Sequence, residues 1–308
     1  MILCCGEALI DMIPAPTKTG LDGFVPHCGG AVFNTAIALG RLGVQTGMLT
    51  GVSNDMFGQQ LTDALKASHV GISHVITTDR PTTLAFVRLL NGHATYDFYD
   101  ENSAGRMLKP DDMPVLPAEV SALYFGGISL ACEPGADAYA SLLERESDGR
   151  AVMLDPNIRP SFIRDIDRYR SRLERMLTLT DIVKVSDEDL NWILPVPLSL
   201  LEKVEAILNK GPSLVILTRG GEGATGFLSN GTEVQVPAVQ AQICDTVGAG
   251  DTFNAGVLAK LSELGQLRKS GLNHLSEDIV REVLSHGARV AAITVSRVGA
   301  NPPWAGEL

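Results

Sequence analysis

Positive charge is scarce in this sequence: 25 Lys and Arg residues stand against 36 Asp and Glu residues, a formal net charge of −11. The negative excess is spread along the chain rather than gathered in a tail. It argues against nucleic acid and against an anionic membrane surface as main partners. A small anionic ligand would therefore have to be held by local dipoles and metal ions.

Cysteine is also scarce, and no two cysteines have a C-x-x-C spacing. The five are Cys4, Cys5, Cys28, Cys132 and Cys244. An odd, scattered set is typical of reduced thiols, so we expect a cytoplasmic protein. No segment approaches the uninterrupted apolar length of a membrane span. Residues 1–14 lack the positive start of a signal peptide and are predicted to hold a first strand.

Several familiar catalytic motifs are missing too. The sequence has no Walker A loop and no H-E-x-x-H, and its six histidines do not form a ligand-spaced cluster. Residues 221–226 read G-x-G-x-x-G, but a dinucleotide site needs a helix directly afterwards. Residues 227–234 are instead typical of a hairpin. The sequence therefore disfavours an oxidoreductase.

What is present is an alternation of short apolar runs with longer helical patterns. Strands, several of them apolar enough for burial on both faces, are predicted at Ile2–Ile10, Gln45–Val52, Ala122–Ile128, Ala151–Leu154, Asp181–Val185 and Leu214–Thr218. Helices are predicted at Ala31–Leu42, Met56–Ser68, Gly135–Glu146, Ile163–Thr178, Leu198–Asn209 and Ser276–Val295. This order predicts a three-layer α/β/α, doubly wound fold with a mostly parallel sheet, in one domain over residues 1–308.

Two regions break the alternation. Residues 14–28 are rich in Gly and Pro. Thr82–Leu90 and Thr95–Tyr99 flank Asn91-Gly92, a strong hairpin signal. Because these pieces do not fit a parallel sheet, we expect a small β-sheet lid, from about residues 12–28 and 82–100, that closes over a site.

The most informative stretch is residues 245–251 (DTVGAGD), which lead into the helical spacing of Thr252–Leu264. A glycine-rich loop at a helix N-terminus presents backbone N–H groups and the helix dipole to an anion. Asp251 at its rim is placed to accept a proton from a hydroxyl near that anion. Aspartate is also common in first helical turns, so this segment alone leaves both interpretations open.

Two further stretches bear on that choice. Gly29 and Gly30 open a predicted helix, and Asn34 lies one turn into it. Residues 155–160 (DPNIRP) follow an apolar strand, at the sheet edge where ligands of open α/β folds bind. Taken singly, Asn34, Asn157 and Arg159 are ordinary solvent-facing or loop residues.

Together these stretches resemble the phosphofructokinase-B (PfkB, ribokinase-like) carbohydrate kinases, and fructokinases in particular. The two family signatures are the glycine pair with Asn34 and residues 245–251, and the similarity runs from Gly6-Glu7 to Gly299-Ala300. The resemblance implies a kinase that uses ATP and Mg²⁺ and, as in related enzymes, a monovalent cation such as K⁺. It also implies a homodimer formed through the β lid.

The resemblance further implies roles for individual residues. Asp251 would be the catalytic base, and the backbone of Gly248, Ala249 and Gly250 the anion hole. The sugar would be bound by Asp11, Gly29, Gly30, Asn34, Tyr99, Asn157 and Arg159. The nucleotide loop T-x-G-x-x-G would be Thr218, Gly220 and Gly223, and the cation loops would contain Asp245, Val247, Thr294 and Gly299.

One element departs from the family pattern. Many relatives carry Asn-x-x-Glu where this chain has Ser186 and Asp189. In the family this element helps to arrange magnesium and phosphates through water. Both residues still offer oxygen atoms, so we expect the same role with a shorter reach.

The substrate is inferred from the run at 155–159, which resembles fructokinases and 2-keto-3-deoxygluconate kinases. The latter typically carry Tyr-Arg before Ser-Ala, whereas here Asp100 follows Tyr99. A carboxylate disfavours an acidic substrate, so we expect a neutral ketohexose, fructose first, phosphorylated on a primary hydroxyl. Arg88 or Arg106 as a substitute charge keeps 2-keto-3-deoxygluconate, or another sugar or nucleoside, as the alternative. A catalytically silent sugar- or nucleotide-binding protein is the non-enzyme alternative.

Overall fold

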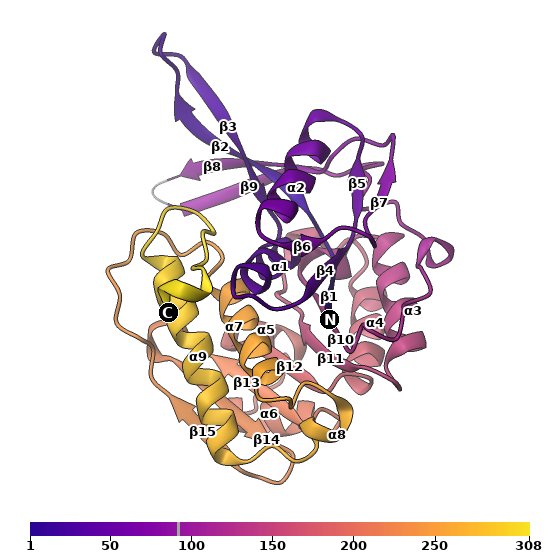
Figure 1. Ribbon diagram of the computed structural model, residues 1–308, viewed down its shortest axis with the longest axis vertical. Helices are drawn as coiled ribbons and strands as arrows, with labels where there is room; N and C mark the ends of the chain where they lie inside the picture. The colour runs from indigo at the N-terminus through magenta and orange to yellow at the C-terminus, as the bar shows by residue number, and fades with distance from the viewer. Residues whose placement is uncertain (91–92) are drawn as a thin grey trace.

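The computed structural model in Figure 1 describes residues 1–90 and 93–308, so the predicted Asn91-Gly92 turn lies outside the described residues. In that part of the chain the largest sheet has nine strands, in the order β15-β14-β13-β12-β11-β10-β1-β4-β6. They are β1 (Ile2–Cys5), β4 (Thr46–Leu49), β6 (Val70–Gly71), β10 (Ala122–Gly126), β11 (Ala151–Asp155), β12 (Ile182–Ser186), β13 (Leu214–Thr218), β14 (Ala224–Leu228) and β15 (Glu233–Val236). Neighbouring strands from β6 to β13 in this order pair in parallel. Strand β14 pairs antiparallel with β13, and β15 pairs antiparallel with β14. The predicted mostly parallel sheet and the hairpin after residue 226 are confirmed.

Helices cover both faces of this sheet, which confirms the three-layer prediction (Figure 1). One face packs against α1 (Ala31–Arg41), α2 (Met56–Ala67), α7 (Ala249–Glu263), α8 (Lys269–Leu272) and α9 (Glu277–Val295). The other packs against α3 (Gly135–Glu146), α4 (Ile166–Thr178), α5 (Asp187–Ile193) and α6 (Leu200–Leu208). No helix in the described ranges is long and apolar enough to cross a membrane.

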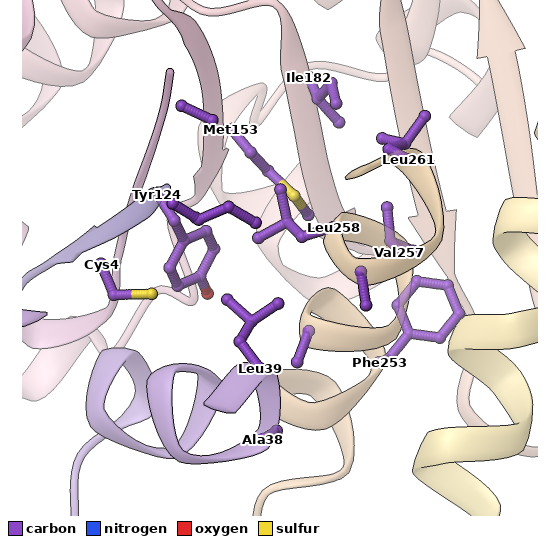
Figure 2. Packing of buried hydrophobic residues seen from close by; sticks show 14 of the residues in the cluster. Cys4, Ala38, Leu39, Tyr124, Met153, Ile182, Phe253, Val257, Leu258 and Leu261 are labelled. Atoms are coloured by element: carbon purple, nitrogen blue, oxygen red, sulfur yellow. The ribbon is translucent and has the colours of Figure 1, made fainter. Parts of the chain in front are cut away.

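The core on the first face brings α1 and α7 against the central strands. Figure 2 shows Tyr124 reaching from β10 toward these two helices, with Leu39 and Leu258 beside it. Helices α7 and α9 approach closely at two glycines, since a Cβ atom built on Gly256 would lie 2.7 Å from the Cα atom of Gly287. The start of α7 is thereby fixed between the sheet, α1 and α9.

A separate four-stranded sheet, in the order β3-β2-β8-β9, projects from the body of the molecule (Figure 1). Its strands are β2 (Leu9–Pro16), β3 (Asp22–Gly29), β8 (Leu84–Leu90) and β9 (His93–Tyr99). The β2–β3 and β8–β9 pairs are antiparallel, and β2 pairs with β8 in parallel. This is the predicted lid sheet. Two short strands, β5 (Gly51–Ser53) and β7 (Ile76–Thr78), pair beside α2.

The prediction of one strand over residues 2–10 is wrong. Strand β1 ends at Cys5 in the large sheet, and β2 begins at Leu9 in the lid sheet. Between them the Glu7 carboxylate turns inward and accepts hydrogen bonds from the N–H of Ala31 (3.0 Å) and of Ser129 (3.2 Å). Helix α1 has no side-chain cap from its own N-cap residue, so Glu7 supplies one and the strand is interrupted. The predicted strand at 45–52 likewise divides, into β4 and β5.

Candidate active site

The candidate site lies where the carboxyl ends of the parallel strands meet the start of α7. Asp155, Ser186 and Thr218 are the last residues of three adjacent strands, β11, β12 and β13. Gly248 caps α7 in the left-handed conformation, with φ 76° and ψ 3°. A Cβ atom built on it would lie 2.6 Å from the Cβ atom of Ala300, so both backbone and space require glycine. The first N–H groups of α7 therefore open at the sheet edge where ligands bind.

Asp251, in the first turn of α7, is buried and held by helix α1. Its Oδ2 atom accepts a hydrogen bond from Asn34 Nδ2 at 2.9 Å, and its backbone oxygen accepts one from Thr35 Oγ1 at 3.0 Å. Burial raises the pKa of Asp251 to about 7, against the opposing effects of the Asn34 hydrogen bond and the Lys184 charge. A carboxylate that titrates near neutral pH is suited to accept a proton.

A buried polar network lies next to Asp251, and the sequence analysis missed most of it. The Asp155 carboxylate accepts from Lys184 Nζ at 3.1 Å and from Asn254 Nδ2 at 2.7 Å. Asn254 also donates to the Tyr124 hydroxyl at 3.0 Å. Lys184 Nζ lies 3.4 Å from the position of a Cβ atom built on Gly250, so its charge is close to the start of α7. The signal available in the sequence was a lysine inside an apolar strand.

Of the predicted sugar-binding residues at the front of the chain, Asn34 contacts Asp251, and Asp11 lies against Gly29. A Cβ atom built on Gly29 would lie 2.1 Å from Asp11 Oδ2, so the carboxylate lies directly over the glycine. Burial raises the pKa of Asp11 to about 6. Gly30 caps α1 with φ 107°, and Asn34 follows one turn later. Tyr99 differs, because it is mostly exposed and packs edge-on against Phe86 within the lid sheet.

The loop after β11 is fixed by its own hydrogen bonds. Asn157, with φ 42°, donates its backbone N–H to Asp155 Oδ1 at 3.1 Å. Arg159 donates to the backbone oxygen of Ile158 at 3.0 Å.

Ser186 and Asp189 form the capping box of α5. Asp189 Oδ2 accepts from Ser186 Oγ at 2.8 Å, and Oδ1 accepts from the N–H of Ile158 at 2.8 Å. Asp189 thus ties the start of α5 to the loop after β11.

A cavity of about 470 Å³ adjoins the start of α7. It is mainly apolar, with walls from α7, α9 and the segment 238–243. Thr218, Gly220 and Gly223, the predicted nucleotide loop, line one side, and Ala249 and Gly250 line the end next to Asp251. Such a cavity suits a flat aromatic base whose phosphates extend toward the helix N-terminus.

Of the four residues predicted to contribute a cation site, Asp245, Val247 and Gly299 come from two loops that meet, whereas Thr294 lies in α9 and not in a loop. Asp245 Oδ1 accepts from the N–H of Val247 at 3.0 Å, and Oδ2 accepts from the N–H of Gly299 at 2.9 Å. Thr294 is buried in α9, where its hydroxyl donates to the oxygen of Val290 at 3.0 Å. Within residues 1–90 and 93–308, no group of three or more His, Cys, Asp or Glu side chains could hold a metal ion.

A helix start with free backbone N–H groups, a buried carboxylate with a pKa of about 7 and an adjoining apolar cavity are together typical of a phosphotransferase site with a hydroxyl acceptor. The sequence pattern of the pfkB family carbohydrate kinases matches residues 1–305, and the chain belongs to this family.

Three similar proteins illustrate the relationship. The fructokinase of Rhizobium leguminosarum bv. trifolii is 50% identical over 285 residues, 91% of this chain and 86% of that protein. The fructokinase of Xylella fastidiosa, solved with bound ATP, is 25% identical with a TM-score of 0.83, covering 97% and 93% of the two chains. A fructokinase variant from Vibrio cholerae O395, solved with fructose, ADP and a potassium ion, is 24% identical with a TM-score of 0.83, covering 97% of this chain and 93% of that one. This last similarity concerns the fold.

Proposed function

We propose that this protein is an ATP-dependent fructokinase, which phosphorylates a primary hydroxyl of fructose to give fructose 6-phosphate and ADP. The observation that carries the proposal is the buried Asp251 carboxylate, held by Asn34 at the N-terminus of α7 beside the cavity. The 50% identity to the Rhizobium fructokinase supports fructose as the sugar.

In the proposed reaction Asp251 hydrogen-bonds the sugar hydroxyl and takes its proton as that oxygen bonds to the γ-phosphorus. The bond between the γ-phosphorus and the bridging oxygen breaks, and ADP leaves with that electron pair. The backbone N–H groups at Gly248, Ala249 and Gly250 stabilise the charge on the transferring group. By analogy with other anion holes, loss of one such donor costs about 10²–10³ in rate.

The polar groups around Asp251 favour a neutral sugar. Asn34, which contacts Asp251, and Asp11, which lies over Gly29, would offer hydrogen-bonding groups for sugar hydroxyls. Both arginines considered as anchors for an acidic substrate already have acidic partners. Arg106 pairs with the buried Asp100 at 2.6 Å, and Arg88 pairs with Asp97 at 2.8 Å. An acidic substrate would have to compete with these carboxylates.

The apolar cavity would hold the adenine ring, with Thr218, Gly220 and Gly223 beside it. Mg²⁺ would be bound chiefly by ATP oxygens, as is usual for this ion, with Asp189 acting through water because both its oxygens already accept hydrogen bonds. When bound, the ion would neutralise negative charge on the phosphates. Asn157 and Arg159 would flank the sugar or the transferred phosphate.

Two further proposals concern ions and partners. Asp245 and the backbone of the loops at Val247 and Gly299 would hold a weakly bound monovalent cation such as K⁺, since the two loops meet at that carboxylate. The exposed apolar side chains of Leu21, Phe24 and Val25 at the β2–β3 hairpin would pair two lids into a homodimer.

We also propose that residues 1–308 act as a single kinase domain. We place the protein in the cytoplasm, where the buried adjacent thiols of Cys4 and Cys5 stay reduced.

The function is tested by measuring ADP release with fructose, ribose, 2-keto-3-deoxygluconate and nucleosides as acceptors. We expect the highest kcat/KM with fructose. A higher value for 2-keto-3-deoxygluconate would contradict the neutral-sugar proposal. Absence of turnover with every acceptor, with ATP binding retained, would instead favour a silent binding protein.

A further inference from the structure

The segment that follows α9 runs back across the molecule and is held by the last residue of α1. In Figure 1 this yellow C-terminal segment lies beside α1. Arg41 Nη1 donates to Asn301 Oδ1 at 2.7 Å and to the backbone oxygen of Pro302 at 2.9 Å. The same guanidinium lies 5.3 Å from the centre of the Trp304 ring, a distance typical of a cation–π contact.

The same segment also contacts residues 245–248, the loop that leads into α7. Gly299 donates its N–H to Asp245 Oδ2 at 2.9 Å. The next residue, Ala300, packs so closely on Gly248 that a Cβ atom there would lie 2.6 Å from that of Ala300. Gly248 is the N-cap whose left-handed conformation begins α7. The segment 299–302 therefore supports the backbone that forms the proposed anion hole.

Helix α1 is thus connected to the start of α7 in two ways, once directly and once through the C-terminal segment. Asn34 holds the Asp251 carboxylate, and Arg41, seven residues later and on the same helical face, holds the segment behind Gly248. We propose that Arg41 is a positioning residue for phosphoryl transfer. It fixes residues 299–302 against Gly248 and so holds the anion hole in its position relative to Asp251. The inference rests on the proposed kinase function.

The side chains involved suit this role. The guanidinium engages a side-chain oxygen and a backbone oxygen with one rigid group, which a lysine ammonium does not reproduce. Pro302 is buried and its ring restricts the backbone, so a shift at Arg41 would be transmitted through Pro302 and Asn301 toward Ala300. Arg297 also donates to Pro302, at 3.4 Å, so loss of Arg41 would loosen the segment without releasing it.

The test uses the full chain with Trp192→Phe, which leaves Trp304 as the single tryptophan. In this background Arg41→Met keeps the aliphatic stem and removes the guanidinium. We expect kcat to fall about 10- to 100-fold, the effect of a misplacement near 1 Å, while the KM for fructose stays within about twofold. Quenching of Trp304 fluorescence by acrylamide should increase. Arg41→Lys should restore part of kcat, and Arg281→Met, at an exposed arginine of α9, should change neither readout.

A second variant separates the two contacts. Ala300→Gly removes the methyl group that packs on Gly248 but leaves Arg41 and its partners in place. It should lower kcat while leaving Trp304 quenching unchanged. The inference is overturned if Arg41→Met increases Trp304 quenching at normal kcat, or lowers kcat without increasing Trp304 quenching. Lack of fructose turnover by the unsubstituted chain would contradict the proposed function instead, and the comparison would then use whichever acceptor it phosphorylates.

Discussion

Asn34 Nδ2 donates a hydrogen bond of 2.9 Å to Asp251 Oδ2, joining the first helix of the chain to the start of α7 across 217 residues. The amide thereby fixes the orientation of the carboxylate. Because Oδ2 is engaged, Oδ1 is the oxygen that we expect to take the substrate proton. The two sequence signatures, at opposite ends of the chain, are thus two sides of one site.

Replacement of the base tests the chemistry directly. Asp251→Asn keeps the shape and the contact with Asn34 but removes the proton acceptor. We expect kcat to fall about 10²–10⁴-fold, the usual contribution of a general base, with ATP binding unchanged. Steady-state kinetics and calorimetric titration with a non-hydrolysable ATP analogue measure the two effects. A kcat within about threefold of the original would contradict the assignment of Asp251 as base.

The same substitution should stabilise the protein at high pH. Burial raises the pKa of Asp251 to about 7 in the folded state, above its value in the unfolded chain. The folded state therefore holds a proton that the unfolded state has lost, and stability falls as pH rises through this interval. Asp251→Asn lacks this dependence. Its advantage in Tm over the original chain should grow between pH 5 and pH 8, and a Tm lower than the original at pH 8 would contradict the argument.

The acid limb of the activity profile should also reflect Asp251. The proposed reaction requires the Asp251 carboxylate, so kcat/KM should fall as pH drops below about 7. Asn34→Ala removes a hydrogen bond that lowers this pKa, so the limb should move upward by about one pH unit. Asn54→Ala, which removes an exposed amide bound to Asp79, serves as the control and should leave the profile in place. A limb that moves downward in Asn34→Ala would refute the stated cause.

Substrate choice is tested at the buried Asp100–Arg106 pair. Asp100→Ala frees the guanidinium, so the ratio of kcat/KM for 2-keto-3-deoxygluconate to that for fructose should rise at least about tenfold. Asp97→Ala breaks the more exposed pair with Arg88 and should change the ratio little. The double variant Asp100→Ala, Arg106→Ala should lose the gain. An unchanged ratio in Asp100→Ala would show that this pair does not select the substrate.

Close packing of α7 on α9 should be sensitive to a single side chain. Gly256→Val would place its Cβ atom 2.7 Å from the Gly287 Cα atom, and backbone cannot yield as a flexible side chain does. We expect a loss of about 1–3 kcal/mol in the free energy of unfolding, measured by urea denaturation. Gly149→Val, at a glycine with open space around it, is the matched control. Equal midpoints for the two variants would contradict the packing argument.

Sequence reasoning recovered the layers, the lid strands and the two signatures, because each depends on local periodicity or on turn residues. It missed Lys184 and Asn254, each a single polar residue within an apolar run. The pairing of both residues with Asp155 becomes visible only when β11, β12 and α7 are placed side by side. Sequence reasoning also predicted β1 and β2 as one strand. The break between them arises because Glu7 caps a helix that begins 24 residues later, which local periodicity does not reveal.

The connection between β1 and β2 has an evolutionary consequence. Within three residues the chain passes from an interior strand of the large sheet into a separate sheet with its own strand order. The lid strands set their register among themselves, so residues on the outer lid can diverge without disturbing the pairing of the core. Exchange of lid residues, among them the proposed sugar ligand Asp11, can therefore proceed in a lineage that inherits an unaltered packing of α7 against the large sheet.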